Sequence, residues 1–561
     1  MNKHDLLQVI LFFVVLFGSA PILGRYMAAV FKEINPFRFF EPVESFLYRV
    51  SGVDAKAEMH WTRYLGALLL LNLWGFLIVF LLQIFQAYLP FNPQHLTGVE
   101  PFLAFNTAVS FMTNTNWQAY SGESTLSYLV QMLGLTVQNF LSAATGMGVL
   151  LALSRGIIRK NSGTIGNFWS DIVKTTLYIL LPLSFIMAVF LVSQGVVQTF
   201  SAYQNVQTLA GTEQIIPLGP AASQIAIKQL GTNGGGFFGV NSAHPFENPT
   251  PFSNFFEMLA ILLIPTAQVF AFGRLIHNRK HAFALFGVMA FLLIAGFGVA
   301  WYSESASAHF AGVAQLLEGK EVRFGVMNSN LWETLTTAAS NGSVNAMHDS
   351  MSPLAILVGM FNIMSGEVIF GGVGAGLYGM FLFVMLTIFL VGLMVGRTPE
   401  YLGKKIDAKE MRWTMAGILI PNLTILIGAA LAICIPSAAA SILNAGPHGL
   451  SEIAYAFSSA AGNNGSALAG LNVNTPFYNS ALSICMLLGR FGIIVPVLAI
   501  AGCLARKSTI AESDGTFHAD NIMFAAILLI SILIVGALTF VPMLLLGPVT
   551  EHLMMISGYL F

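Results

Sequence analysis

Long apolar stretches alternate with short polar segments along this chain of 561 residues. A helix needs about 20 apolar residues to cross the hydrocarbon core of a bilayer. Ten stretches reach that length, at residues 6–29, 64–86, 125–154, 168–194, 253–276, 281–302, 353–396, 411–436, 476–505 and 522–547. The pattern predicts an all-α polytopic membrane protein with ten transmembrane helices.

Four polar motifs rich in Asn, Gly, Thr and Ser lie between these stretches, at residues 113–116, 231–236, 339–343 and 462–466. If Asn116, Gly234, Gly342 and Gly465 are equivalent, the intervals between them are 118, 108 and 123 residues. Each motif follows an apolar segment that is roughly one-third to one-half as long as a spanning helix. These segments predict half-helices at residues 102–112, 221–230, 331–339 and 452–461.

A segment that enters the bilayer, turns on such a motif and leaves again is a re-entrant loop, which survives only inside protein or beside water. Four such loops can surround a pore whose backbone carbonyls replace the water shell of a cation. The negative ends of the half-helices favour the same cation. Ordinary Asn-Gly turns are the alternative, and the fourfold recurrence argues against them. The candidate filter residues are Thr113, Asn114, Thr115, Asn116, Thr232, Asn233, Gly234, Ser340, Asn341, Gly342, Asn463, Asn464 and Gly465, with Gln118 as hydrogen-bonding support.

The motifs divide the chain into four helix–pore-loop–helix repeats around a pseudo-fourfold pore. We expect a first transmembrane helix and cytoplasmic loop at 1–63, repeat 1 at 64–154, repeat 2 at 168–276, repeat 3 with a broken second helix at 281–396, repeat 4 at 411–505, and a final transmembrane helix at 522–547.

The basic residues predict the orientation of the chain. Of its 25 Lys and Arg residues, 18 lie in the connections 31–63, 155–167, 274–281, 397–412 and 506–520. Because cytoplasmic loops carry the excess of Lys and Arg, these connections are expected on the cytoplasmic side. All four motifs then enter from outside, and both termini are extracytoplasmic.

The apolar stretch 353–396 is too long for one straight helix. Its 44 residues would span about 66 Å as a helix, more than twice the hydrocarbon thickness. It is also interrupted by glycines. We expect a single broken helix with a glycine-rich loop below the filter; a tilted helix with close glycine packing is the alternative. The glycines of the expected break are Gly371, Gly372, Gly374, Gly376 and Gly379.

Glu367 and Arg490 are ionisable residues in the middle of the apolar stretches 353–396 and 476–505. A charge at membrane depth is costly and points to a function or a specific partner. Arg490 either meters cations below the filter or binds helix-end carbonyls, and Glu367 either lines a cation route or pairs with a buried donor. The residues themselves leave both choices open.

The composition excludes several functions. Hydrophobic residues make up 56% of the chain and charged residues 9%, against about 25% charged residues in soluble domains. The lipid bilayer is therefore the expected environment. A net charge of −1 without a basic cluster argues against nucleic acid. The sequence has no G-x-x-x-x-G-K-[ST] loop, so we expect no ATP site and no catalytic residue on this chain.

Several longer motifs carry a resemblance to a known family, namely residues 113–118, 231–238, 241–250, 366–374, 396–401 and 461–467. They closely resemble the potassium-binding, channel-like subunit of the bacterial Kdp potassium-transporting ATPase, within the superfamily of K⁺ transporters. The resemblance implies high-affinity uptake of K⁺, which would be the only metal ion, in the bacterial inner membrane. It also implies three partners: a P-type ATPase catalytic subunit that hydrolyses ATP, a small single-span subunit, and a third one with one soluble domain.

The resemblance further implies a route for the ion. The broken helix would close the cytoplasmic end, and K⁺ would pass sideways through a tunnel to the ATPase subunit. Gate or tunnel roles would fall to Glu367, Gly371, Gly372, Gly374 and Arg490, and Arg397 matches the family's arginine at the closed cytoplasmic side. The competing hypotheses are an autonomous K⁺ channel or ion-gradient-driven K⁺ transporter, and a non-conducting scaffold. The glycine break and the motifs favour the ATPase subunit.

Overall fold

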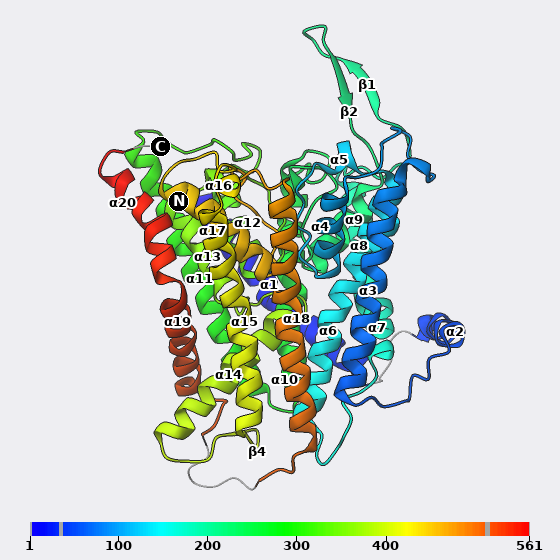
Figure 1. The fold of residues 1–561 in the computed structure, drawn as a ribbon, viewed down its shortest axis with the longest axis vertical. Helices are drawn as coiled ribbons and strands as arrows, with labels where there is room; N and C mark the ends of the chain where they lie inside the picture. Colours follow the sequence, from blue (N-terminus) through cyan, green and yellow to red (C-terminus); the bar gives the residue numbers. More distant parts are fainter. Residues whose placement is uncertain (1–2, 33–37, 511–516, 560–561) are drawn as a thin grey trace.

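The computed structural model describes residues 3–32, 38–510 and 517–559. Within these residues ten helices are long and apolar enough to span a membrane, which confirms the predicted number. They stand side by side in one bundle (Figure 1). Their labels and bounds are α1 (Lys3–Phe31), α3 (Trp61–Phe85), α6 (Val137–Ile158), α7 and α8 (Phe168–Thr175 and Leu181–Ser193), α10 (Pro251–Leu275), α11 (Arg279–Phe310), α14 (Ala375–Met394), α15 (Ala408–Cys434), α18 (Pro476–Arg506), and α19 and α20 (Ile522–Leu544 and Thr550–Ile556).

Three spans contain π-helical turns: η3 (Val130–Thr136) before α6, η4 (Thr176–Leu180) between α7 and α8, and η7 (Leu545–Val549) between α19 and α20. Proline explains the second of these. Pro182 has no N–H group to bond the carbonyl of Tyr178 four residues earlier. The hydroxyl of Tyr26 in α1 donates to that carbonyl instead, at 2.5 Å. The disruption in one helix therefore becomes a contact with another.

The outer surface of the bundle is apolar. Large hydrophobic side chains such as Ile22, Phe185, Met394 and Leu538 are more than two-thirds exposed. Exposed apolar area on this scale is typical of a protein that contacts lipid or another protein. Polar side chains are instead concentrated inside, around four shorter helices.

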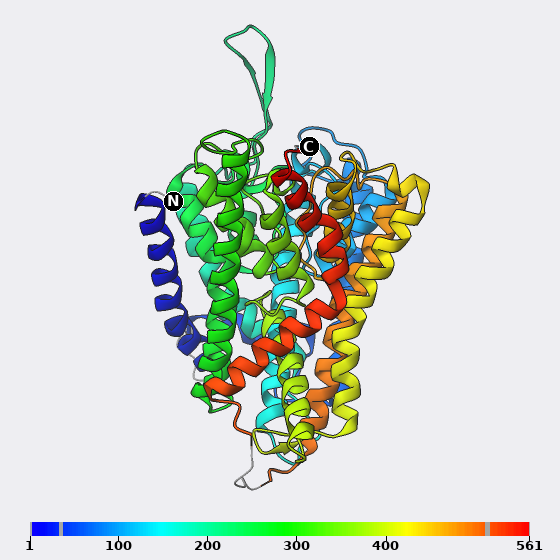
Figure 2. The same ribbon diagram turned by 90° about the vertical axis from the view of Figure 1, so that its left-hand side faces the viewer.

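The shorter helices are α4 (Pro101–Met112), α9 (Ala221–Leu230), α12 (Gly325–Ala338) and α17 (Pro447–Ala461). They lie in one half of the bundle, at the end of the molecule where both chain termini lie (Figures 1 and 2). The first two match their predicted half-helices within one residue. The other two begin earlier than predicted, because their first turns contain polar residues such as Asn328 and His448 that are nevertheless buried.

The long apolar stretch of the third unit is interrupted. It forms α13 (Pro353–Met364) and α14 (Ala375–Met394), joined by residues 365–374. Gly371, Gly372 and Gly374 lie in this connection, whereas Gly376 and Gly379 lie inside α14. The break therefore ends before Gly376, earlier than the run of glycines suggests.

Several small elements were not expected from the sequence. An antiparallel hairpin of β1 (Gln204–Gln207) and β2 (Glu213–Ile216) projects from one end of the molecule (Figure 1). Near the other end, β3 (Glu400–Tyr401) pairs with β4 (Lys404–Lys405). These are the only strands in the part of the chain that the structure describes. The remaining short helices are α2 (Glu41–Ser51), α5 (Gly122–Thr125), α16 (Pro436–Ala439), η1 (Arg38–Phe40), η2 (Gln86–Tyr88), η5 (Asn241–Ala243) and η6 (His348–Ser350).

Candidate ion pathway

The loops that follow the four short helices meet in a closed ring. Asn116 Nδ2 donates to the carbonyl of Gly234 at 3.1 Å, which joins the first loop to the second. A Cβ atom on Gly234 would lie 1.8 Å from the carbonyl oxygen of Asn341 in the third loop. A Cβ on Gly342 would lie 2.0 Å from that of Asn464 in the fourth loop. A Cβ on Gly465 would likewise lie 2.0 Å from the carbonyl oxygen of Thr115 in the first loop. Each loop thus contacts the next, and the ring closes.

The four loops share one backbone conformation. Two positions in each, separated by one residue, have positive φ, a region that favours glycine and tolerates asparagine. Threonine and serine also adopt it here. The first position holds Asn114 (φ +67°), Thr232 (+50°), Ser340 (+50°) and Asn463 (+51°), and the second holds Asn116 (+53°), Gly234 (+67°), Gly342 (+89°) and Gly465 (+98°). Because equivalent residues match in all four loops, the register inferred from the sequence spacing agrees with the backbone.

Asparagine side chains brace each loop against its neighbour. Asn233 Nδ2 donates to Asn114 Oδ1 at 2.6 Å, and Asn114 Nδ2 donates to the Thr232 carbonyl at 2.9 Å. Asn341 and Asn464 donate to carbonyls at the ends of the preceding short helices, those of Lys228 and Thr336, at 3.1 and 2.9 Å. The buried amides are thereby used to hold the loops together.

Thr113 and Gln118 flank the ring in the first loop. The hydroxyls of Thr113 and Thr115 lie 2.7 Å apart. Gln118 contacts Gly236 of the second loop twice: its Nε2 donates to the Gly236 carbonyl at 3.0 Å, and its Oε1 accepts from the Gly236 N–H at 2.8 Å. Gln118, which follows the first loop, therefore supports the second loop.

A wide pocket opens on one side of the ring. Asn116, Gly235, Gly342 and Gly465, one residue from each loop, line it, and its free volume is about 560 Å³. The ring therefore faces open space at the end of the molecule that carries the hairpin.

The connection between α13 and α14, residues 365–374, contacts the opposite side of the ring. The N–H of Val373 donates to Thr232 Oγ1 at 2.8 Å, and the N–H of Gly371 donates to the carbonyl of Ala338 at 2.9 Å. The hydroxyl of Ser340 donates to the Glu367 carboxylate. Gly374 packs against Gly146 of α6, where a Cβ would lie 2.1 Å from the carbonyl oxygen. This side of the ring is therefore covered.

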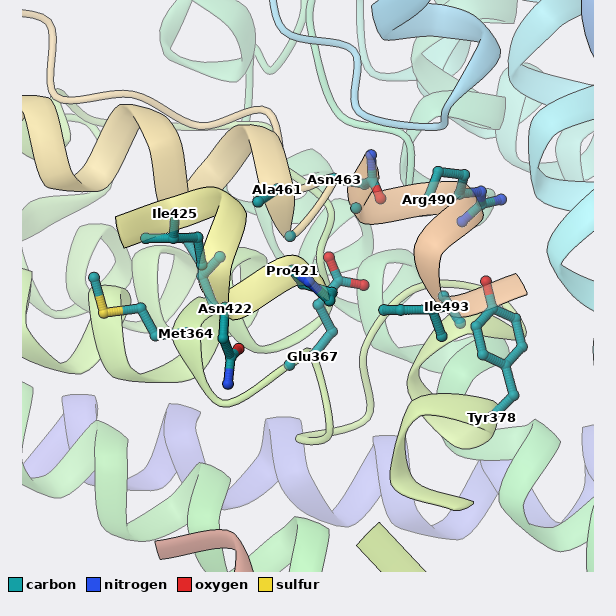
Figure 3. Close-up of a pocket in the computed structure, with 15 residues that line it drawn as sticks. Met364, Glu367, Tyr378, Pro421, Asn422, Ile425, Ala461, Asn463, Arg490 and Ile493 are labelled. Carbon is teal, nitrogen blue, oxygen red and sulfur yellow. The ribbon is translucent and has the colours of Figure 1, made fainter. Parts of the chain in front are cut away.

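A small cavity lies beside this connection, between α15 and α18. Glu367, Tyr378, Asn422, Asn463 and Arg490 are among its lining residues (Figure 3). Its free volume of about 20 Å³ is close to the minimum for one water molecule. Arg490 also donates to the carbonyl of Ser142 in α6 at 2.9 Å. Both interpretations of Arg490 thus have a structural basis, since it lines the cavity and also binds a carbonyl.

Arg397 lies apart from the other candidate residues. It is exposed just beyond the end of α14, where its N–H donates to the carbonyl of Gly392 at 2.8 Å. The structure therefore does not bring it to the ring or to the cavity.

Sequence reasoning overlooked a buried ion pair behind the second loop. Lys228 of α9 and Glu247 lie 2.5 Å apart with both side chains fully buried. A lysine inside a short membrane-embedded helix is itself a signal of function or of a specific partner. Lys228 is not among the 18 basic residues of the five connections that predict the orientation, so the charge pattern alone did not single it out.

Comparison with known proteins identifies the family. The family described as "Potassium-transporting ATPase A subunit" matches residues 10–553. A relative from Leptospira interrogans serovar copenhageni, named potassium-transporting ATPase potassium-binding subunit, is 55% identical and aligns over 99% of both chains. One of the same name from Rhodospirillum centenum is 54% identical, over 100% of this chain and 99% of its own.

A solved structure shares the fold. The crystal structure of the potassium transporter TrkH from Vibrio parahaemolyticus superposes with a TM-score of 0.50 at 15% sequence identity, over 88% of this chain and 97% of that one. With the full-length match to the family, the sequence and the fold agree: this chain belongs to the potassium-transporting ATPase A subunit family.

Proposed function

We propose that this chain is the K⁺-binding and translocating subunit of an ATP-driven potassium uptake complex. K⁺ enters from outside, loses its water shell in the ring of four loops and passes to a P-type ATPase subunit. The observation that carries the proposal is the closed ring, in which equivalent residues of four loops have the same alternating backbone conformation.

The chemistry of the ring suits a weakly hydrated monovalent cation. In each ring loop one residue of negative φ lies between two of positive φ, and this alternation turns successive peptide groups so that their carbonyls can line one side of the chain. The asparagine amide nitrogens donate between the loops. This leaves oxygen atoms as the groups available to an ion: the backbone carbonyls and the unpaired Oδ1 atoms of Asn116 and Asn233. Each short helix also ends at the ring, so its negative end is directed there. The filter residues are those named from the sequence, supported by Gln118.

Residues 365–374 act as the closing element on the cytoplasmic side. Gly371, Gly372 and Gly374 let this connection approach the ring and α6, where a side chain would clash at Gly371 and Gly374. The cavity that Glu367 and Arg490 line lies between α15 and α18, to one side of the ring. That position supports a sideways exit towards a partner. Arg397, remote from the cavity, has a role only at the cytoplasmic surface.

The four repeats and their boundaries are part of the same proposal. Each contains a span, a short helix, a ring loop and a second span, in the ranges 64–154, 168–276, 281–396 and 411–505. The ring's open side is extracytoplasmic, as are both termini, in the bacterial inner membrane. The ATPase catalytic subunit hydrolyses ATP. The complex is completed by the subunit with one soluble domain and by the small single-span subunit.

An autonomous K⁺ channel or ion-gradient-driven K⁺ transporter is the second candidate, because the ring alone suits either. The hydrogen bonds between residues 365–374 and the ring favour the first candidate, since an open channel needs a clear axis.

Purification of the tagged chain from its host, followed by reconstitution into liposomes, separates the candidates. We expect an ATPase to co-purify and K⁺ uptake to require ATP. A Gly234→Asp variant should lose K⁺ affinity and discrimination against Rb⁺ and NH₄⁺. ATP-independent flux through the purified chain would favour the channel, and unchanged ion preference in Gly234→Asp would overturn the filter.

A further inference from the structure

The second ring loop contains the longest glycine run of the four, Gly234–Gly235–Gly236. Consecutive glycines give the backbone more freedom than any other sequence. Gly234 and Gly235 both have positive φ. This loop is therefore the one most in need of external support if the ring is to keep a fixed size.

Each glycine of the run is held by a different side chain. Asn116 donates to the Gly234 carbonyl at 3.1 Å, and Gln118 holds both backbone groups of Gly236. The Gly235 carbonyl, between them, accepts from Lys228 Nζ at 2.9 Å. The lysine ammonium thus completes the support of the glycine run from behind.

Lys228 and Glu247 form a fully satisfied buried pair. The three donors of the ammonium go to Gly235 O, to Ser242 Oγ at 3.3 Å and to Glu247 Oε2 at 2.5 Å. Glu247 Oε1 accepts the N–H of Phe238 at 2.8 Å. The pair therefore fixes the loop at two points, Gly235 and Phe238, three residues apart.

The equivalent position in the other repeats carries a hydroxyl. Lys228 precedes Gly234 by six residues, as Ser110 precedes Asn116, Thr336 precedes Gly342 and Ser459 precedes Gly465. The hydroxyls of Thr336 and Ser459 accept the N–H groups of Gly342 and Gly465, both at 2.9 Å. An ammonium can only donate, so in the second loop the polarity is reversed and a carbonyl is held.

We propose that Lys228 and Glu247 are positioning residues that set the ion selectivity of the ring. Lys228 holds the Gly235 carbonyl, and Glu247 holds both Lys228 and the chain beyond the glycines. The proposal rests on the filter function proposed above. Without the pair, the glycine run relaxes, the ring loses its fixed size, and cations that differ from K⁺ mainly in radius are no longer distinguished.

The test uses the complete complex in proteoliposomes and measures ATP-driven uptake of K⁺, Rb⁺ and NH₄⁺. Lys228→Met keeps the length of the side chain and removes its donors. We expect apparent K⁺ affinity to fall by on the order of tenfold, the scale of one charge-assisted hydrogen bond. The preference for K⁺ over Rb⁺ and NH₄⁺ should fall with it, while the maximal rate changes less.

A second buried Lys–Glu pair provides a matched control. Lys320 lies 3.4 Å from Glu304, with both side chains buried, and donates to the Ser350 carbonyl in an outer connection at 2.8 Å. Lys320→Met also leaves a buried glutamate unpaired. It should affect all three cations alike and leave their ratios unchanged, because it frees no carbonyl of the ring.

Glu247→Gln keeps shape and size and decides the matter if Lys228→Met does not assemble. We expect a smaller change in the same direction. Unchanged ion ratios in an assembled Lys228→Met complex, or in Glu247→Gln if only that assembles, overturn the inference. If Gly234→Asp alters the ratios in the same assay, the filter stands without this role for the pair; if it too is silent, the proposed function itself fails.

Discussion

The third and fourth repeats use equivalent positions in opposite ways. Gly342 and Gly465, Pro353 and Pro476, and Glu367 and Arg490 are each separated by 123 residues. In the fourth repeat, the position of the third pair is Arg490, which lies inside the continuous helix α18 and donates to the Ser142 carbonyl. In the third repeat it is Glu367, which lies in the break between α13 and α14 and has a φ of +59°.

In the proposed function, this difference lets the fourth repeat form part of the pore wall while the third closes the pore. Both stretches contain glycine at the preceding position, Gly366 and Gly489. Only the third continues into Gly371, Gly372 and Gly374, which allow the chain to turn under the ring. Glu367 and Arg490 then line the same cavity, the first from the connection between α13 and α14 and the second from the continuous helix α18.

Removing the break is expected to have the largest effect. A chain that lacks residues 366–374, with α13 joined to α14, should let K⁺ leak through the complex without ATP, because the hydrogen-bonded cover of the ring is gone. K⁺ efflux from liposomes measures this. Deletion of the exposed hairpin 204–216 is the control and should not leak. Equal, near-zero leakage in a well-folded 366–374 deletion would show that these residues are not the closure.

The second-largest effect is expected from a mutation at the ring contact between the third and fourth repeats. A Cβ on Gly342 would lie 2.0 Å from the Asn464 carbonyl oxygen, at a φ of +89°. Gly342→Ala should therefore weaken apparent K⁺ affinity by roughly ten- to a hundredfold, as expected for combined clash and backbone strain. Gly211→Ala, at a φ of +80° with nothing within 4 Å, is the matched control. Similar uptake kinetics in both variants would contradict the ring assignment.

The opposite charges can be compared directly. Arg490→Met should leave assembly intact and lower ATP-coupled K⁺ uptake by about tenfold. The mutation removes both the positive charge of the guanidinium beside the cavity and its hydrogen bond to the Ser142 carbonyl. Glu367→Gln keeps an acceptor for the Ser340 hydroxyl and should have a smaller effect. Uptake and ATP hydrolysis are measured on the same preparation. Failure of Arg490→Met to assemble, with Glu367→Gln normal, would make Arg490 a structural residue.

The smallest effect concerns the outer ends of the third and fourth repeats, where they meet the final helix. His448, in the first turn of α17, lies 3.1 Å from Asp349 and 2.9 Å from Glu551. Burial alone lowers the pKa of His448, but hydrogen bonds to these two carboxylates outweigh it and raise the pKa to about 10. Its stabilising contribution is therefore complete below the unfolded value of about 6.5 and is lost as pH rises towards 10.

Thermal unfolding of the detergent-solubilised complex between pH 6 and pH 10 tests this clamp. We expect His448→Gln to lower Tm by about 1 to 2 °C at pH 6 and to show less difference from the unaltered chain at pH 10. A difference that is constant or grows with pH would contradict a protonated histidine in the folded protein.

The apolar pattern was sufficient for the spans, because bilayer thickness fixes their length whatever their partners. The polar motifs between the spans marked the four loops, and the spacing of these motifs agrees with the shared positions of positive φ. Thr232 and Ser340 could not have been assigned positive φ from their residue types, since neither favours it; contacts from neighbouring loops impose it. The early starts of α12 and α17 were missed for a related reason: their polar first turns are buried by tertiary packing.

The role of Lys228 was hidden for another reason. Only the folded chain shows that its ammonium meets Glu247 and the Gly235 carbonyl. The cavity was likewise invisible, because it forms where the connection between α13 and α14 meets α15 and α18. Sequence spacing predicted which residues are equivalent, while the structure revealed which equivalent residues make different contacts.

The closure of the ring also bears on biosynthesis. Its final contact joins residues far apart in the chain: Asn463 donates to Thr115 across 348 residues, at 3.0 Å. The first loop is inserted long before its neighbour on that side has left the ribosome. A nascent or truncated chain that ends before the fourth loop therefore contains three of the four loops and cannot close the ring. Such a chain leaves the first and third loops without their neighbours in the ring, so we expect it to be less stable in the membrane than the finished subunit.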